Sequence, residues 1–159
     1  MNKLLLILKR NMKEGETHVK RLNSAYAKMK AFMPLSAEKI QKLSEDEIEH
    51  VDQYLYRFAK LQDVIGEKIF ASLLSFLGEE TGKKSFIDIF NRLEQLDIVH
   101  NYDKWIKLRL LRNELAHEYE DDPEMNAEKL NSIYNLKNDL EKYFHDIKIY
   151  LQRFKEFIN

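Results

Sequence analysis

Residues 44–78, with the sequence SEDEIEHVDQYLYRFAKLQDVIGEKIFASLLSFLG, decide the fold that this chain predicts. Apolar side chains recur there at spacings of three and four residues, which is the period of an α-helix with one buried face. These side chains are Ile48, Val51, Leu55, Phe58, Leu61 or Gln62, Ile65, Ile69, Leu73 and Phe76. Ser44 and Glu47 predict a capping box at the start, and Gly78 predicts the end. We therefore expect one long amphipathic helix that tolerates Gly66 in its interior.

Further helices are predicted on both sides of this stretch. Residues 3–32 suit one helix, either continuous or broken near Gly15. It should end before Pro34, because the residue before a proline is pushed out of helical geometry. Side chains that can cap a helix, or a proline that can begin one, precede the remaining apolar stretches. They are Ser36, Ser85 before a helix through Leu96, Asp103, and Asp122 with Pro123 before the last helix.

The last predicted helix carries an apolar stripe from Leu130 to Ile158 that only Lys137 interrupts. A stripe of this length is typical of a helix that packs against partners. Its aromatic side chains are more often part of a core or a dimer interface than a platform for stacking bases. They are Tyr143, Phe144, Tyr150, Phe154 and Phe157.

The composition limits the class of protein. The chain has 159 residues with four glycines, two prolines and no cysteine, which leaves little material for hairpins and none for disulfides. We expect an all-α, up-and-down four- to five-helix bundle in a single domain, residues 1–159, with about residues 1–40 as an N-terminal helical extension. The longest apolar run, Leu4 to Leu8, is too short to cross a membrane, and we expect a cytoplasmic protein. The net charge of −1 argues against a protein that coats nucleic acid.

The richest candidate site is the octet Arg112-Asn113-Glu114-Leu115-Ala116-His117-Glu118-Tyr119. At about 100° per residue, its arginine, amide, histidine and tyrosine share roughly half of a helix surface with Ala116. Leu108, Leu111 and Leu115 occupy another sector that can be buried in a core. Basic side chains precede His117 and acidic ones follow it, so a local basic patch remains available for RNA. Trp105 lies on the side of Arg112, where it either lines a cleft or packs.

This octet resembles the R-N-x-x-x-H-x-Y motif of the HEPN superfamily and, within it, the HepT-like toxins of toxin–antitoxin pairs. The arginine, the polar residue after it, the histidine and the tyrosine all match. Residues 86–93, Trp105 and residues 56–58 are similar in kind. The resemblance covers roughly residues 45–155, which look like the family's helical core, and the first forty or so residues lie outside it.

The resemblance implies a metal-independent endoribonuclease with no cofactor. His117 would then transfer protons, Arg112 would bind the phosphate, and Asn113 would support them. It also implies a homodimer that joins two motif helices in one RNA-cleaving cleft. A nucleotidyltransferase antitoxin of the MNT type would neutralise the toxin by attaching adenylate to Tyr119 (AMPylation).

Two other interpretations stay open. The bundle is also used in this superfamily as a non-catalytic adaptor or substrate-binding subunit for a nucleotidyltransferase. Alternatively, the protein is a structural bundle in which Arg112 and His117 pair with Glu114 or Glu118. A metal site is not expected, because the other histidines are scattered without a His-x-x-x-His or Glu-x-x-His pair among them. They are His18, His50, His100 and His145.

Overall fold

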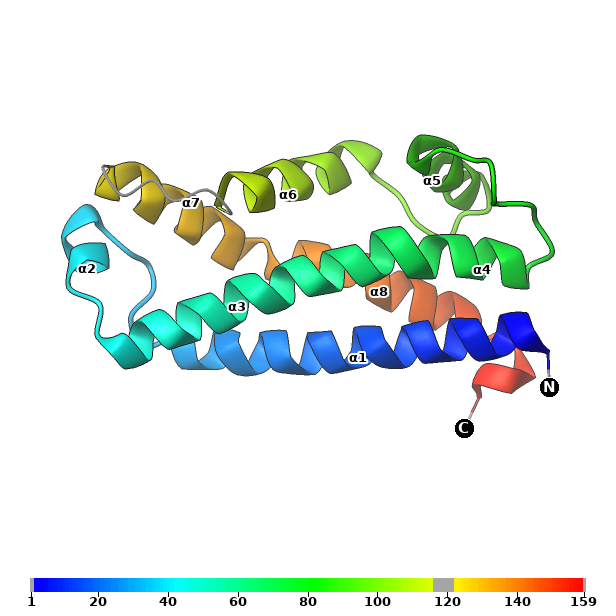
Figure 1. Ribbon diagram of the computed structural model, residues 1–159, viewed down its shortest axis with the longest axis horizontal. Helices are drawn as coiled ribbons and strands as arrows, with labels where there is room; N and C mark the ends of the chain where they lie inside the picture. Colours follow the sequence, from blue (N-terminus) through cyan, green and yellow to red (C-terminus); the bar gives the residue numbers. More distant parts are fainter. Residues whose placement is uncertain (1, 116–121, 159) are drawn as a thin grey trace.

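The structure, a computed structural model, describes residues 2–115 and 122–158, and in these residues all regular structure is helical. Four long rods run in alternating directions along the molecule, and the two ends of the chain lie at the same end of the bundle (Figure 1). The rods are α1 (Lys3–Met29), then α3 (Glu45–Asp63) continued by η1 (Val64–Ile69) and α4 (Phe70–Phe76), then α6 (Tyr102–Leu115), then α7 (Pro123–Asn135) with α8 (Lys137–Leu151). The short elements are α2 (Ala37–Gln41), α5 (Phe86–Gln95) and η2 (Lys155–Phe157). The expected all-α fold is confirmed.

The long central rod begins and ends where the sequence predicts. The Ser44 hydroxyl accepts from the Glu47 backbone N–H at 3.1 Å, and the Glu47 carboxylate accepts from the Ser44 backbone N–H at 2.9 Å. Together they form the expected capping box. At the other end Gly78 has a φ of +89°, which glycine adopts without strain.

The middle of this rod contains a feature that the sequence did not predict. Residues Val64–Ile69 form the π-helical segment η1, a wider turn that proteins tend to keep at functional sites. Both Leu61 and Gln62 are buried just before it, although the sequence pattern left open which of the two faces the core. Gly66 lies inside the segment, and a Cβ atom there would come within 2.8 Å of Cζ2 of Trp105.

The first helix, α1, is continuous through Gly15, so the unbroken helix is the correct one of the two possibilities that the sequence left open. Gly15 is buried against the ring of Phe144, and a Cβ atom there would lie 2.9 Å from its Cε1. Glycine is used here for close packing between helices rather than to interrupt one. The helix ends at Met29, a few residues before the expected end and before Pro34.

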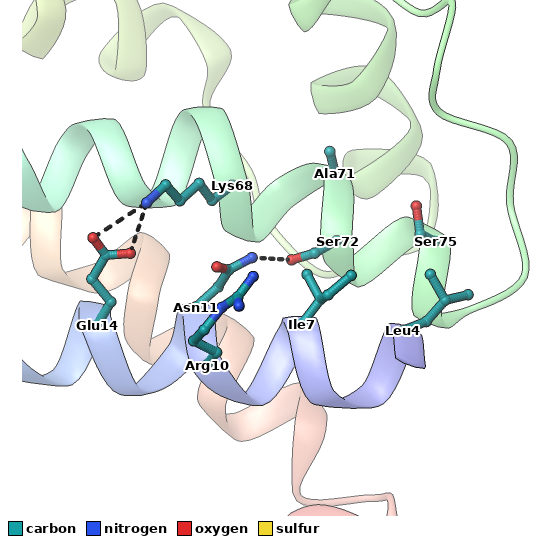
Figure 2. A pocket seen from close by; sticks show the side chains of 9 residues that line it. All are labelled: Leu4, Ile7, Arg10, Asn11, Glu14, Lys68, Ala71, Ser72 and Ser75. Atoms are coloured by element: carbon teal, nitrogen blue, oxygen red, sulfur yellow. Dashed lines mark hydrogen bonds and ion pairs between the residues drawn. The ribbon is translucent and has the colours of Figure 1, made fainter. Parts of the chain in front are cut away.

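Polar contacts hold the N-terminal half of α1 against the central rod (Figure 2). Asn11 donates from Nδ2 to the Ser72 hydroxyl at 3.1 Å, and the Lys68 ammonium lies 3.0 Å from the Glu14 carboxylate. These contacts join residues more than 50 positions apart in the sequence. They bring α1 fully into the bundle.

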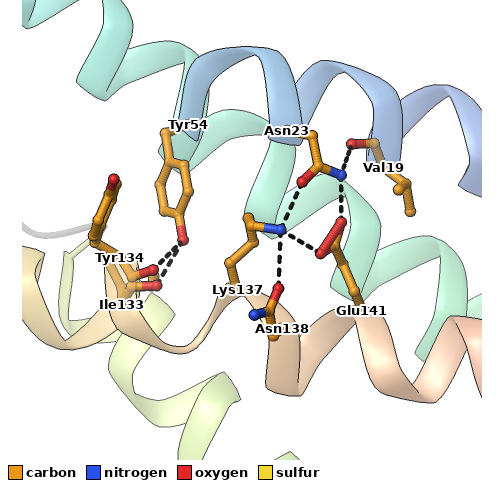
Figure 3. A network of polar contacts seen from close by, with 8 residues as sticks. All are labelled: Val19, Asn23, Tyr54, Ile133, Tyr134, Lys137, Asn138 and Glu141. Carbon is orange, nitrogen blue, oxygen red and sulfur yellow. Dashed lines mark hydrogen bonds and ion pairs between the residues drawn. The ribbon is translucent and has the colours of Figure 1, made fainter. Parts of the chain in front are cut away.

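The expectation of one long C-terminal helix is wrong in two places. The chain breaks at Leu136, where φ is −97° and ψ is 7°, so that α7 and α8 are separate helices. Lys137 follows the break and is buried, with its ammonium group reaching Asn23 and Glu141 (Figure 3). The helix α8 ends at Leu151 rather than at Ile158. Beyond it, the Phe154 ring packs edge-on against Phe76 at 5.3 Å between centroids, so the aromatic side chains here contribute to the bundle.

The buried apolar side chains of the described residues form one cluster that includes every long rod. Within it, a group of aromatic rings lies between the central rod, α5, α6 and α8. Its members are Phe70, Phe86, Phe90, Trp105 and Tyr143. This group fixes the position of α6, which carries the first part of the candidate motif. No helix in residues 2–115 or 122–158 has the length and apolar character needed to cross a membrane.

Candidate functional site

The helix that carries the first part of the motif, α6, starts at Tyr102, one residue before the expected Asp103. Asn101 caps it, because the Asn101 side chain accepts from the Lys104 backbone N–H at 3.0 Å. The backbone of Asn101 has a φ of +72°, which asparagine tolerates better than most residues. The Tyr143 hydroxyl donates to the Asn101 carbonyl at 2.7 Å, and burial raises the pKa of this hydroxyl. The start of α6 is therefore anchored to α8.

The buried side of α6 is formed mainly by Trp105 and Leu108. The Trp105 ring lies 5.2 Å from the Phe70 ring and 5.1 Å from the Tyr143 ring, between centroids. Trp105 therefore packs, and it also lines the hollow described below. Leu111 and Leu115 are half-buried against the core, as their predicted sector suggests.

Arg112 points toward the central rod and forms an ion pair there. Its Nη1 atom lies 2.5 Å from Oδ1 of Asp63, the last residue of α3. The two side chains are 26% and 32% exposed, respectively, so both remain reachable from solvent. Glu114, the partner that a purely structural interpretation assigns to Arg112, instead lies 3.4 Å from the Lys129 ammonium.

A small hollow of about 100 Å³ lies beside this ion pair, between the central rod and α6. Its lining consists of Gln62, Asp63, Gly66, Glu67, Phe86, Trp105, Arg109, Arg112 and Asn113. Two carboxylates and two guanidinium groups contribute to it, so their formal charges cancel. The hollow thus brings together two of the predicted site residues, Arg112 and Asn113, with acidic neighbours that the sequence did not indicate.

Gln62 is the most deeply buried polar side chain at this hollow. It is 2% exposed, and within the described residues neither its Nε2 nor its Oε1 has a hydrogen-bond partner. A buried amide without partners costs about 1–3 kcal/mol of stability, and native proteins usually satisfy such a group with water or a ligand. Gln62 therefore has donor and acceptor capacity still available next to Arg112.

The second half of the predicted site, His117 and Tyr119, lies outside the described residues. The basic residues that precede His117 in the sequence differ in their contacts. Lys104 lies 3.0 Å from Asp139 on α8, whereas Lys107 and Arg109 are exposed. The exposed members are the ones that an RNA backbone could reach.

Larger hollows lie elsewhere on the bundle, among them two that the sequence did not predict. One, of about 770 Å³, lies between α1 and the central rod around Arg10, Asn11 and Ser72 (Figure 2). The other, of about 640 Å³, lies between α6 and α7 and includes the exposed Leu110. No group of three histidine, aspartate or glutamate side chains in the described part of the chain is arranged to hold a metal ion.

Comparisons of the chain with family models, curated proteins and solved structures find no match. The inference of function therefore depends on the octet itself and on the surroundings of Arg112.

Proposed function

We propose that this protein is a metal-independent endoribonuclease of the HEPN type, acting as the toxin of a toxin–antitoxin pair. The observation that carries the proposal is the R-N-x-x-x-H-x-Y octet, whose arginine and asparagine line a hollow at the exposed edge of a firmly packed helix. Arg112 and Asn113 remain accessible there, while Trp105 and Leu108 on the same helix are buried. Accessible polar side chains on a rigid element are what a catalytic site requires.

The chemistry is cleavage of an RNA phosphodiester by its own neighbouring 2′-hydroxyl. The 2′-oxygen forms a bond to phosphorus as the bond to the 5′-oxygen breaks, which gives a 2′,3′-cyclic phosphate and a 5′-hydroxyl. One imidazole removes the 2′-hydroxyl proton and another protonates the leaving 5′-oxygen, since histidine exchanges protons near neutral pH. Arg112 stabilises the negative charge that grows on the phosphoryl oxygens. Asn113 orients the imidazole or a substrate oxygen.

This mechanism uses a base and an acid on opposite sides of the phosphorus, whereas each chain supplies one His117. A two-fold dimer solves the problem by bringing two motif helices to one cleft. A stable interface of this kind buries about 800 Å² on each subunit. The restraining partner in this proposal is an MNT-type nucleotidyltransferase that attaches adenylate to Tyr119.

The test is RNA cleavage by the purified protein and by three variants. Arg112→Ala and His117→Ala should each lower the cleavage rate at least about 100-fold, while the circular dichroism spectrum and the dimer persist. His100→Ala is the matched control, because His100 is exposed, pairs only with Asp97 among the described residues, and lies before α6. Cleavage should continue in EDTA. Activity that a chelator abolishes, or that survives both motif substitutions, rejects the proposal.

The adaptor interpretation is the second candidate, and one observation favours it. Asp63 already neutralises Arg112, and the formal charges around the hollow cancel, so phosphate attraction there is weaker than two arginines would give alone. An adaptor would bind a nucleotidyltransferase tightly and show no RNase activity as a purified dimer. The cleavage assay separates the two functions directly.

A further inference from the structure

Asp63 lies at a position that no sequence motif marked. It is the last residue of α3 and directly precedes the π-helical segment η1. Its carboxylate holds Nη1 of Arg112 from a helix 49 residues away in the sequence. The pair joins the two elements that form the hollow.

The geometry around this pair is rigid on both sides. Gly66, one turn after Asp63, lies so close to the Trp105 ring that a Cβ atom would come within 2.8 Å of it. Trp105 in turn is two turns before Arg112 on α6 and is almost completely buried. Close packing at Gly66 and Trp105 therefore sets the distance across which Asp63 reaches Arg112. Packed interiors deform little, so this distance is well defined.

The pair uses only part of the arginine. A guanidinium group carries five N–H donors in a fixed plane, and Asp63 accepts from Nη1. Within residues 2–115 and 122–158, Nε and Nη2 of Arg112 make no other hydrogen bond. A carboxylate that holds one part of the plane leaves a second edge free for a phosphate and fixes the direction in which that edge points.

We propose that Asp63 is a positioning residue, which fixes the Arg112 guanidinium so that its free edge faces the RNA phosphate. The inference rests on the proposed ribonuclease function and extends it to a residue outside the octet. Asp63 does not touch the reacting atoms. It acts through Arg112, because a hydrogen bond from a neighbouring residue holds a catalytic side chain in one orientation.

Asp63 has a second, opposite effect, because its negative charge repels the same phosphate. Two like charges several ångströms apart at a protein surface repel each other, although solvent screens the repulsion. Removing the carboxylate should therefore tighten the binding of RNA while it slows the chemistry. A purely structural defect would weaken both together.

The experiment measures cleavage and binding separately for Asp63→Ala and Asp63→Glu. In Asp63→Ala, kcat should fall about 10- to 100-fold, because a misplaced catalytic group loses that much. Affinity for an RNA blocked by 2′-O-methylation, measured by fluorescence anisotropy, should rise about threefold, as expected from the removal of one nearby like charge. Asp63→Glu keeps the charge and should recover part of kcat with no gain in affinity.

The matched control is Glu79→Ala. Glu79 accepts from Nε of Arg92 at 2.7 Å, and these side chains are 24% and 38% exposed, much like the Asp63–Arg112 pair. The control removes a similar ion pair between packed elements, away from the hollow. It should leave kcat and RNA affinity unchanged. If Asp63→Ala leaves kcat unchanged, or lowers kcat and affinity together, Asp63 is not a positioning residue.

A separate measurement tests the positioning if the wild-type protein does not cleave RNA. In that case the proposed function fails, yet the guanidinium geometry can still be followed by ¹⁵N NMR of Arg112. Rotation about its Cζ–Nε bond should be slow in the wild type and fast in Asp63→Ala. Fast rotation in the wild type would overturn the positioning role on its own.

Discussion

Substitution of Lys137 by methionine tests how the buried polar network holds α8 against α1. Lys137 and Glu141 are 7% and 4% exposed. The Lys137 ammonium donates to Glu141 Oε2 at 2.6 Å, to Asn23 Oδ1 at 2.6 Å and to Asn138 Oδ1 at 3.0 Å (Figure 3). An ammonium group has three donors, and all of them are used. Glu141 Oε1 accepts from Asn23 as well, so the network is fully connected.

The magnitude follows from what the substitution leaves behind. Methionine replaces the aliphatic stem of Lys137 but leaves the buried Glu141 carboxylate with one remaining donor, Nδ2 of Asn23. Removing one partner of a buried ion pair costs about 3–5 kcal/mol, because the other charge stays buried and uncompensated. Replacing both partners with apolar side chains is close to neutral in other proteins. Lys137→Met should therefore lose about 3–5 kcal/mol, and Lys137→Met with Glu141→Met should recover at least about 2 kcal/mol of it.

The assay is urea denaturation followed by circular dichroism at pH 7, with Lys142→Met as the control. Lys142 lies on the same helix and pairs with Asp146 at 2.8 Å with the same four-residue spacing, but its side chain is 70% exposed. An exposed pair of this kind contributes about 0.5 kcal/mol or less. The reasoning is refuted if Lys137→Met costs no more than Lys142→Met, or if the double variant is less stable than Lys137→Met.

Three further predictions concern a histidine, a glycine and the motif tyrosine. Burial, reinforced by the Arg57 guanidinium that donates to Nδ1 at 3.0 Å, lowers the pKa of His18; Lys60 and Lys68 act in the same direction and Glu14 opposes them. The folded state therefore binds fewer protons than the unfolded state, and the free energy of unfolding should fall as the pH drops below about 6.5. Urea titrations at pH 7.5 and 5.5 measure this fall, which should be smaller in His18→Gln than in the wild type. Gly66→Ala should destabilise the protein by up to about 2 kcal/mol in the same assay, because overpacking against Trp105 costs about 1–3 kcal/mol and the gain in helix propensity returns roughly 1 kcal/mol. A stabilised variant would contradict the close packing at Gly66. Tyr119→Phe should keep most RNase activity but escape neutralisation by the antitoxin. The measurements are toxicity on co-expression with the antitoxin and the mass of peptides that contain residue 119. If the antitoxin suppresses wild-type toxicity without changing that mass, it acts by binding over the site rather than by modification.

Features that depend on neighbouring residues were predictable from the sequence. The capping box of Ser44 and Glu47 involves residues three apart, and the apolar stripe of the central rod repeats every three or four residues. Local chemistry decides both, so no knowledge of the tertiary contacts is needed. Asp122 and Pro123 were likewise predicted as the cap and first-turn proline of a helix, and the structure confirms both at the start of α7.

Features that depend on distant residues were not predictable. In the sequence, Lys137 only interrupts an apolar stripe. Its burial is explained by the hydrogen bond that its ammonium group donates to Asn23, 114 residues away. In the sequence, Gly15 is a possible helix breaker, and only the packing of Phe144 against it shows why a glycine is there. In the candidate site, the octet carries Arg112 and Asn113, but nothing in the sequence indicates Asp63 as the partner. Each of these residues has its meaning set by contacts between helices.

The position of Arg112 also separates a functional role from a structural one. A half-exposed ion pair such as the one with Asp63 contributes about 0–1 kcal/mol to stability, since solvent screens it and two side chains must be ordered to form it. The fold therefore depends little on Arg112, because the buried side chains Trp105 and Leu108 already pack α6 against the core. Stabilisation of a transition state by the same guanidinium would contribute far more. Removal of one hydrogen-bond donor from an oxyanion hole, for example, raises the activation free energy by about 2.7–4 kcal/mol. Arg112→Ala should thus lower activity by much more than it lowers stability, and a variant that lost both equally would place Arg112 among the structural residues of the bundle.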